Sequence, residues 1–481
     1  MSGAKYMTKR KVAIRALADR TAPMFARWRE RNSYFHDEDE RYTRFLATAH
    51  NGRVLDLGCG NGDLLASLSP DHGIGVDFSE KAIEVARTRH PDLELIVGDV
   101  EDSDVLAGLD GPFDLILLSD TIGELEDVQS TFSNLHMLCH PETRVIIGYH
   151  SQYWGPLLKT VEAAGMKRPS PPQNWLSSDD IASLMGLADF EIVTREWRQL
   201  VPRHVFGLGR LINRFIAPMP FLRKLCLRSY LVARPFRAQA LDNPSATVVV
   251  PCRNERGNIE PAVTRVPAFC DDIEILFVEG GSSDGTWEEI ERVIESYPEL
   301  DIKAIKQPGK GKGDAVRAGF DAARGDVLMI QDADLTAPPE DLPKFYQALA
   351  DGRGEFINGT RLVYPLDSDA MRFLNLIANK IFSLTFTWLL NQRFTDTLCG
   401  TKVLTKKNYQ RIAANRAYFG DFDPFGDFDL ILGATRLNMK VEEIPVRYRA
   451  REYGSTQISR FRHGLMLLRM TVFAFMKLKA I

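Results

Sequence analysis

Short apolar runs alternate with helical segments along two stretches of the chain. In the first stretch, the runs that we expect to form strands are Arg53–Leu57, Gly73–Val76, Leu93–Val97, Phe113–Leu118 and Arg144–Tyr149. In the second stretch, they are Ala246–Val250, Ile273–Val278, Ile302–Ile305 and Val327–Ile330. Helical segments such as Glu80–His90 lie between them. Strands separated by helices are typical of a doubly wound parallel sheet, so the pattern predicts an α/β protein with two Rossmann-like domains.

The same pattern predicts the domain boundaries. We expect a first domain at residues 1–235 and a second at residues 246–460, because a chain of 481 residues exceeds what one core normally supports. The stretch PFRAQALDNPS at Pro235–Ser245 has proline near both ends and is typical of a linker, which we place at residues 236–245. A last segment, residues 461–481, follows the second domain.

Three segments are amphipathic. The span Arg198–Arg237 carries nine Lys or Arg and no Asp or Glu, and its residues 198–225 form a basic insertion with interleaved apolar residues. Phe373–Leu390 and Phe461–Ile481 mix apolar and polar residues at near-helical spacing, and neither has the roughly 18–20 apolar residues needed to span a bilayer. Such segments bind anionic membrane surfaces, so we expect interfacial helices. The alternatives are a solvated insertion before a last strand at Cys226–Ala233, and two helices that pack on the core or form an oligomer interface.

Composition indicates the cellular compartment and excludes one class of partner. The net charge of −4 argues against bulk binding of nucleic acid. The six cysteines form no C-x-x-C pair, and no apolar core follows the basic N-terminal residues, so we expect a reducing compartment and no signal peptide. These features predict a cytoplasmic protein, peripheral on the inner face of the membrane. The oligomeric state stays open.

A glycine-rich turn follows the first expected strand. The stretch Val54–Gly62 reads VLDLGCGNG, and glycine lets a chain turn tightly and lets a ligand touch the backbone. The dinucleotide pattern G-x-G-x-x-G would place glycine at position 63, where Asp63 stands. Asp77 ends the next strand and can accept hydrogen bonds from two ribose hydroxyls, and Asp99 ends the third, where an adenine edge would lie. Ligands of open α/β sheets bind outside the carboxyl ends of strands, so these residues predict a nucleotide site.

Residues from about 30 to 235 resemble the class I S-adenosylmethionine-dependent methyltransferases. The resemblance implies that S-adenosylmethionine is bound by Asp56, Gly58, Gly60, Gly62, Asp77 and Asp99. The alternative is a Rossmann-like domain that binds another nucleotide or none. No motif encodes the methyl acceptor; Asp120, His136 and His150 are candidate bases, although a lone histidine is more often structural. The N-terminal residues Tyr34–His36 are a candidate lid.

A second glycine-rich loop lies in the other half of the chain. Gly309–Leu335 reads GKGKGDAVRAGFDAARGDVLMIQDADL, in which the loop with Lys312 leads to a helix and an apolar strand. Asp332 and Asp334 follow that strand, and alternate residues of an extended chain share a side. Two carboxylates there suit Mg²⁺ or Mn²⁺, which bridges a protein to a diphosphate. A P-loop would need Ser or Thr after its lysine, where Asp314 stands.

Residues from about 245 to 460 resemble the inverting family 2 glycosyltransferases, and most closely the dolichyl (polyprenyl) phosphate mannose synthase group. The resemblance implies a GT-A fold and a nucleotide-sugar donor. It assigns the metal to the D-x-D pair Asp332 and Asp334, with Asp334 also catalytic. It implies that the donor is bound by Pro251, Asn254, Glu255, Glu279, Asp284, Lys312 and Asp332. The family usually has Asp-Asp where this chain has Glu279-Gly280, so the base stays open.

The resemblance also implies an acceptor phosphate, met by Arg361, Arg372 and Arg451. Each arginine taken singly is equally consistent with a surface ion pair, and Thr456-Gln457 replaces the Ser-Lys that the family often has. A sugar hydroxyl as acceptor would need a carboxylate base, for which Asp427 and Asp429 are the candidates. A lipid phosphate, already anionic, needs no base, and the two acids would then be structural.

The interpretation that joins these features is a bifunctional enzyme. Its second domain would transfer a sugar to a polyprenyl phosphate, and its first would methylate a component of the same glycolipid or glycan pathway. An alternative keeps both domains and has the sugar go to a glycan or small-molecule hydroxyl. A second alternative makes one half a non-catalytic docking module.

Overall fold

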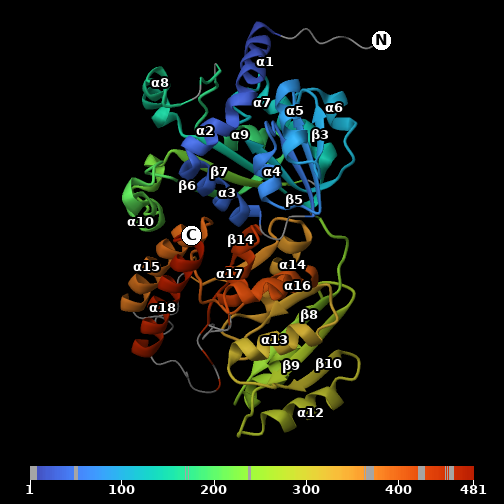
Figure 1. Cartoon of the computed structure of the whole chain (residues 1–481). Helices are drawn as coiled ribbons and strands as arrows, with labels where there is room; N and C mark the ends of the chain where they lie inside the picture. The colour runs from blue at the N-terminus through green and yellow to red at the C-terminus, as the bar shows by residue number, and fades with distance from the viewer. Residues whose placement is uncertain are drawn as a thin grey trace. The chain divides into compact units, whose positions relative to one another are not determined.

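The computed structural model describes residues 8–47, 52–167, 169–171, 173–236, 240–361, 363, 373–420, 428–449, 451, 453 and 460–481, with backbone alone for 373–379 and 460–464. The chain divides into two compact units. The first comprises residues 1–238 together with 479–481, and the second comprises residues 239–478. Each unit contains one seven-stranded sheet (Figure 1).

The sheet of the first unit has the strand order β3-β2-β1-β4-β5-β7-β6. Its strands are β1 (Arg53–Leu57), β2 (His72–Asp77), β3 (Glu94–Val97), β4 (Phe113–Ser119), β5 (Cys139–His150), β6 (Phe190–Arg198) and β7 (Arg228–Pro235). The helices of this unit are α1 (Lys9–Thr21), α2 (Phe25–Arg31), α3 (Ser33–Ala47), α4 (Asp63–Ser67), α5 (Glu80–Arg89), α6 (Ser103–Ala107), α7 (Val128–Asn134), α8 (Gly155–Ala163), α9 (Ser178–Leu187) and α10 (Leu208–Leu211).

The sheet of the second unit has the order β10-β9-β8-β11-β13-β12-β14. Its strands are β8 (Ala246–Cys252), β9 (Ile273–Glu279), β10 (Asp301–Lys306), β11 (Val327–Ile330), β12 (Phe356–Thr360), β13 (Lys402–Thr405) and β14 (Val441–Pro445). The helices of this unit are α11 (Ile259–Thr264), α12 (Thr286–Ser296), α13 (Lys312–Ala322), α14 (Leu342–Ala350), α15 (Phe373–Leu390), α16 (Lys406–Asn415), α17 (Phe428–Arg436) and α18 (Arg460–Leu478).

The predicted α/β class is confirmed, but both sheets are mixed and not wholly parallel. In the first, β7 runs antiparallel to β5 and to β6. In the second, β13 runs antiparallel to β11 and to β12. The parallel core of each sheet consists of the strands that the apolar pattern predicts, because a strand covered on both faces is apolar at nearly every position. The strands β6, β12, β13 and β14 were not predicted.

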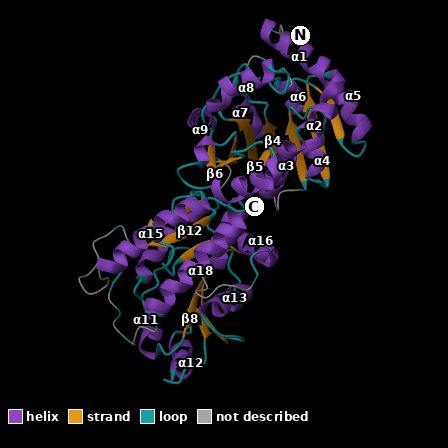
Figure 2. Ribbon diagram, turned by 60° about the vertical axis from the view of Figure 1, so that its left-hand side comes forward, coloured by secondary structure: helices purple, strands orange, loops and turns teal. Residues whose placement is uncertain are grey.

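Strand β4 shows how the apolar runs build two cores. Ile116 and Leu118 face a cluster that includes residues of α7 and α9, whereas Leu115 and Leu117 face a cluster that includes residues of α3 and α4. Successive side chains of a strand point to opposite faces, so an unbroken apolar run is what a sheet buried between two helical layers requires. The helical layers beside the strands are visible in Figure 2.

Helices α15 and α18 contact each other in the second unit (Figure 2). Trp388 of α15 and Phe475 of α18 have ring centroids 5.8 Å apart. Each helix buries one side, as at Phe386 and Met470, and exposes apolar residues on another, as at Leu384. Among the residues that the structure describes, no helix has the length and apolarity needed to cross a bilayer.

Candidate functional sites

The glycine-rich turn of the first unit connects β1 to α4 and borders a cavity of about 1340 Å³. Gly58 adopts φ 82°, and a Cβ built there would lie 2.3 Å from Thr121 Oγ1, so this position requires glycine for conformation and for space. The residues of the predicted S-adenosylmethionine site that line the cavity are Asp56, Gly58, Gly60, Asp77 and Asp99. Gly62 is not among the lining residues; it has φ 74° and precedes α4.

The two acids nearest the turn are held in different ways. Asp56 is buried, and its Oδ1 has no hydrogen-bond partner among the described residues. Burial, with a contribution from Asp77, raises the pKa of Asp56 to about 7. Asp77 accepts from the Gly60 N–H through Oδ2 and from the Ser79 N–H through Oδ1, both at 2.9 Å. The turn therefore fixes the orientation of the Asp77 carboxylate.

Lys11 is a residue of this site that the sequence pattern did not reveal. It comes from α1 and forms ion pairs with Asp99 and, at 2.8 Å, with Glu101. Burial opposes the charge on Lys11, yet the two acids raise its pKa above the usual value. Arg10 donates to the carbonyls of Leu125 and Gly123, each at 2.9 Å. Helix α1 is therefore joined to the rim of the cavity by two consecutive basic residues, and 88 residues separate Lys11 from Asp99.

These residues fit S-adenosylmethionine. The cofactor is a cation with an amino group, a ribose and an adenine, and Asp56 presents a buried oxygen without a partner. Asp77 would hold the ribose hydroxyls, and Asp99 the adenine side. A drug-sized ligand occupies a pocket of about 300–1,000 Å³. The cavity is larger than that range, so it has room for a second molecule beside the cofactor.

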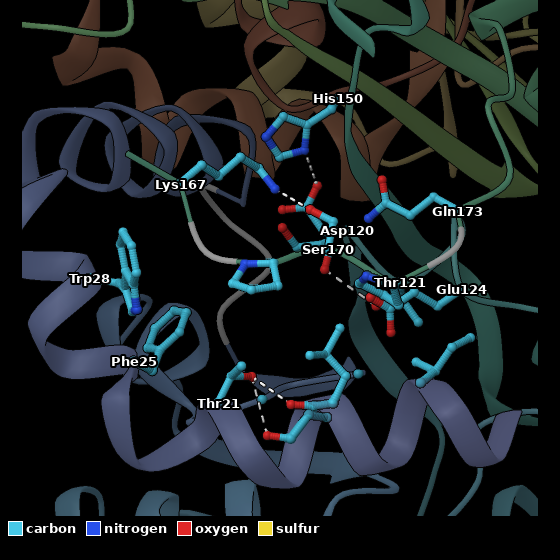
Figure 3. A pocket seen from close by; sticks show the side chains of 18 of the residues that line it. Thr21, Phe25, Trp28, Asp120, Thr121, Glu124, His150, Lys167, Ser170 and Gln173 are labelled. Atoms are coloured by element: carbon cyan, nitrogen blue, oxygen red, sulfur yellow. Dashed lines mark hydrogen bonds and ion pairs between the residues drawn. The ribbon is translucent and has the colours of Figure 1, made fainter. Parts of the chain in front are cut away.

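The rest of the cavity wall combines aromatic and polar side chains (Figure 3). Phe25 and Trp28 lie on one side, and Gln173, Asp120 and His150 lie on another. Phe35 and His36 of α3 also line the cavity. Tyr34 is not among the lining residues, and its hydroxyl accepts from Asn213 at 3.0 Å.

The three candidate bases fall into two groups. Asp120 and His150 line the cavity. His136 does not, because its Nε2 lies 2.6 Å from the Ala188 carbonyl and its ring stacks on Phe190 at 4.3 Å. His136 is therefore a structural histidine.

In the second unit, the loop after β8 is built on the loop after β9. Asn254 adopts φ 56°, its N–H donates to Ser282 Oγ, and its Oδ1 accepts from the Ser283 N–H, both at 2.9 Å. Pro251 lies in β8, paired with Val278 of β9. Two predicted donor-binding residues thus stand at the carboxyl end of β8, beside the end of the parallel strand β9, where ligands of open sheets bind.

Glu279 and Asp284 organise the same loops. Glu279 ends β9 and accepts from the Ser282 N–H at 2.5 Å. Asp284 accepts from the Arg256 N–H at 3.3 Å and from the Thr286 N–H at 3.1 Å. Burial opposes ionisation of both acids, but these hydrogen bonds hold the pKa of each below its usual value. Their carboxylates are accordingly ionised, and Asp284 acts on the loop geometry.

The D-x-D acids are each paired with a cation from elsewhere in the chain. Lys312 lies 2.7 Å from Asp332 Oδ1. Arg451 contacts Asp334 Oδ2 at 2.7 Å and Glu255 Oε1 at 3.1 Å. Although burial would raise it, Lys312 holds the pKa of Asp332 below its usual value. Arg451 thus joins the loop after β8 to the D-x-D segment, and it brings together predicted donor, metal and acceptor residues.

The D-x-D pair fits a divalent ion that keeps ligands from other sources. Among the described residues, no group of three or more His, Cys, Asp or Glu side chains could hold a metal ion. Mg²⁺ is commonly bound by one or two carboxylates together with waters and substrate phosphates. Asp332 and Asp334 would hold such an ion, which would neutralise charge on a departing diphosphate. Gly400 permits this arrangement, because a Cβ there would lie 1.9 Å from Asp332 Oδ2.

The other predicted acceptor and base residues are placed as follows. Arg361 forms a bidentate pair with Asp396, at 2.6 Å from Nε and 2.8 Å from Nη2. Asp429 is buried and accepts from Arg317 at 3.2 Å and from Arg416 at 2.8 Å. Arg372 and Asp427 lie outside the described residues.

Comparisons with known proteins agree with this division of the chain. Residues 25–195 match the family model described as a methyltransferase domain, and residues 247–412 match the model described as glycosyl transferase family 2. The chain therefore contains a methyltransferase domain followed by a family 2 glycosyltransferase domain. The predicted domain order and the predicted α/β fold class with two Rossmann-like domains are confirmed.

Curated relatives match the second domain. A dolichol-phosphate mannosyltransferase of Pyrococcus furiosus is 37% identical over 119 residues, which cover 24% of this chain and 33% of the relative. An undecaprenyl-phosphate 4-deoxy-4-formamido-L-arabinose transferase of Aeromonas hydrophila is 32% identical over 110 residues, which cover 22% of this chain and 34% of the relative. The chain thus spans about a third of the length of these relatives.

A solved structure resembles the first unit. It is a methyltransferase of Thermotoga maritima described as a possible histamine N-methyltransferase, with a TM-score of 0.36 and 16% identity over 46% of this chain and 99% of that one. At this score the likeness supports no conclusion on substrate.

Replacing Asp77 by alanine tests the first site. We expect the affinity for S-adenosylmethionine to fall at least about tenfold, because a charge-assisted hydrogen bond contributes roughly 1.5–3 kcal/mol. Isothermal titration of the whole chain measures the change. Asp71→Ala removes an exposed acid of the same domain and serves as the control. Unchanged affinity in a folded Asp77→Ala protein would contradict the assignment of this pocket.

Proposed function

We propose that the chain is a bifunctional enzyme of a glycolipid pathway. Its second domain transfers a sugar, with inversion and with Mg²⁺ or Mn²⁺, from a nucleotide-sugar donor to a polyprenyl phosphate. Its first domain transfers a methyl group from S-adenosylmethionine to a component of the same pathway. The fusion of the two domains in one chain motivates the shared pathway.

The observation that carries the sugar transfer is the group of acids and cations around Arg451. Glu255, Asp332 and Asp334 come from two segments, and Arg451 and Lys312 hold them in place. The carboxylates of the D-x-D pair present oxygen ligands, and the two cations offer N–H donors to diphosphate oxygens. In this proposal Asn254, Glu279 and Pro251 border the nucleoside, and Asp284 keeps the surrounding loop in shape.

Two contacts support a phosphate over a hydroxyl as acceptor. A general base must have its carboxylate available to the acceptor, and Asp429 is buried between two arginines. An anionic phosphate needs no base and is positioned by arginine. Arg361 uses Nε and Nη2 for Asp396, which leaves Nη1 for a phosphate. We assign Arg361, Arg372 and Arg451 to the acceptor phosphate and a structural role to Asp429.

Exposed apolar side chains support binding to a membrane surface. On α18, Leu468 and Val472 are 55% and 63% exposed. In the basic insertion of the first unit, Phe206 is fully exposed and Phe221 is 93% exposed. Arginine and lysine are interleaved with both sets of apolar residues, and this combination favours an anionic lipid surface. We place the protein on the inner face of the cytoplasmic membrane, where a polyprenyl phosphate is accessible.

The metal requirement is tested with Asp334→Asn. We expect this variant to lose nearly all sugar transfer and its response to Mg²⁺ or Mn²⁺, because the amide is a weaker ligand for a hard cation. The measurement is transfer from radiolabelled nucleotide sugars at increasing metal concentration. Asp351→Asn, an exposed acid of the same unit, should behave as the wild type. Full activity of the wild type after treatment with EDTA would refute the metal role.

The acceptor is tested with a matched pair, a short-chain polyprenyl phosphate and the corresponding polyprenol. We expect transfer to the phosphate alone, because the site as proposed has arginines for the anion, and the described candidate base, Asp429, is buried between two arginines. Chromatography of the lipid product measures both reactions in one assay. Transfer to the polyprenol or to a soluble sugar, with none to the phosphate, would establish the hydroxyl alternative instead.

Membrane binding is tested by sedimentation with liposomes that contain anionic lipid. We expect the protein to sediment with them, and binding to weaken as salt screens the basic residues. The double variant Leu468→Glu/Val472→Glu should bind less, because it places charge on the apolar face of α18. Leu187→Glu, on an exposed residue at the end of α9, is the control. Equal sedimentation of both variants would contradict the role of α18.

A further inference from the structure

Three polar side chains form a connected group, of which Asp120 and His150 line the first unit's cavity and Arg228 is buried behind them. His150 ends β5, Asp120 follows β4, and Arg228 begins β7. His150 Nδ1 lies 2.9 Å from Asp120 Oδ1, and Arg228 forms an ion pair with the same carboxylate. Figure 3 shows His150 and Asp120 facing one another beside the cavity. The S-adenosylmethionine residues named above do not include any of the three.

The contact with Asp120 determines which nitrogen of His150 carries the proton. An ionised carboxylate can only accept a hydrogen bond, so Nδ1 of a neutral His150 donates to Asp120 at 2.9 Å. Arg228 Nη1, which can only donate, lies farther from the same Nδ1, at 3.4 Å, so the shorter contact with Asp120 sets the tautomer. The other nitrogen, Nε2, then has a lone pair and is the basic atom. Among the described residues, Nε2 of His150 has no hydrogen-bond partner. The side chain is 18% exposed and lines the cavity, so a bound molecule can contact it.

Arg228 keeps Asp120 ionised. Its side chain is completely buried, and its Nε also lies 2.8 Å from Asp39 Oδ1. Burial would raise the pKa of Asp120, but Arg228 and His150 hold it well below the usual value. Asp120 adopts φ 60°, a backbone conformation that is uncommon outside glycine and recurs at functional sites. The carboxylate is therefore a permanent acceptor for His150.

The cavity contains a second imidazole, which is less suited to act as a base. His36 is largely buried, and burial lowers its pKa to about 4. Its ring packs edge-on against Phe25 and Phe35. Phe35 also stacks on His150, with ring centroids 5.8 Å apart. His36 is thus part of the aromatic wall, and His150 is the imidazole with an oriented acceptor behind it.

We propose that His150, positioned by Asp120, is the general base of the methyltransferase and that the methyl acceptor is a hydroxyl group on a partly apolar molecule. This inference rests on the proposed binding of S-adenosylmethionine. We infer that the acceptor is partly apolar because Phe25, Trp28, Leu157 and Trp175 line the cavity. The cavity volume of about 1340 Å³ exceeds what one drug-sized ligand needs, so the acceptor can bind beside S-adenosylmethionine.

The step balances without a further reactant. The acceptor O–H proton passes to His150 Nε2 as the oxygen forms a bond to the methyl carbon. The bond between that carbon and sulfur breaks, and its electron pair stays on sulfur. The products are a methyl ether, S-adenosylhomocysteine and a protonated His150, which returns its proton to water. A hydroxyl needs this base because it is a poor nucleophile until its proton is removed.

The tautomer of His150 can be measured without any ligand. Nitrogen NMR of the full chain with labelled histidine should show His150 as the Nδ1–H tautomer, with the signal assigned by its loss in His150→Gln. Asp120→Asn should change that tautomer population, because an amide can donate as well as accept. His136→Gln should leave the His150 signal unchanged. A wild-type His150 in the Nε2–H tautomer would overturn the proposal.

Methyl transfer tests the chemistry. The probes are octyl glucoside and 4-octylphenol, which carry hydroxyls, and octylamine, which does not. We expect methylation of a hydroxyl probe and a fall of about 100-fold or more in kcat for His150→Gln, the range for loss of a general base. The affinity for S-adenosylmethionine in titration should stay unchanged. Added imidazole should restore part of the activity of His150→Ala, which a merely structural role would not allow.

The outcomes separate the two hypotheses. Absence of S-adenosylmethionine binding would refute the proposed function itself. Binding with transfer to octylamine alone, or with no transfer to any probe, would overturn the hydroxyl acceptor. Transfer that is equally fast in wild type, His150→Gln and the control His136→Gln would overturn the base.

Discussion

A carboxylate that leaves water needs a cation or an N–H donor, and this constraint organises both sites. Parallel strands end together at one edge of a sheet, and in this chain the residues that follow several of those ends are acids. Asp99, Asp120, Asp332 and Asp334 all occupy such positions and all are paired with Lys or Arg. The pairing fixes the orientation of the acids, and at Asp120 and Asp332 the cationic partner holds the pKa of the carboxyl below its usual value.

The partners of these acids come from distant parts of the chain. Lys11 reaches Asp99 from α1, and Arg451 reaches Glu255 across 196 residues of sequence. Each partner also ties a segment outside the parallel core to the edge where ligands bind. The same contacts that stabilise buried charge therefore assemble each site from separate elements. Asp56 is the exception, because its Oδ1 is buried without a partner among the described residues, and a cationic ligand would supply one.

The apolar pattern predicted the elements that are buried on both faces. Strands β4 and β11 contain the uninterrupted apolar runs Leu115–Leu118 and Val327–Ile330, and they form the centre of the two sheets. The unpredicted strands contain polar residues that tertiary contacts bury. Strand β13 begins with the buried Lys402, and β6 buries Glu196 and Arg198. Strand direction was also beyond the pattern, because an apolar run does not state whether its neighbour is parallel.

The site residues also divide into those with a local sequence signature and those that depend on tertiary contacts. Glycines and acids at strand ends were identifiable because a turn after a strand has a local signature, whereas Lys11 has none. The pairing of Arg361 with Asp396 and of Asp429 with two arginines also depends on tertiary structure. The most direct test of two working sites is isothermal titration of the intact chain, first with S-adenosylmethionine and then with a nucleoside diphosphate in the presence of Mn²⁺. Two sites with separate residues predict saturable binding of each ligand, with Asp77→Ala weakening only the first and Asp334→Asn only the second. Failure of either ligand to bind the wild type would mean that the corresponding half is a docking module.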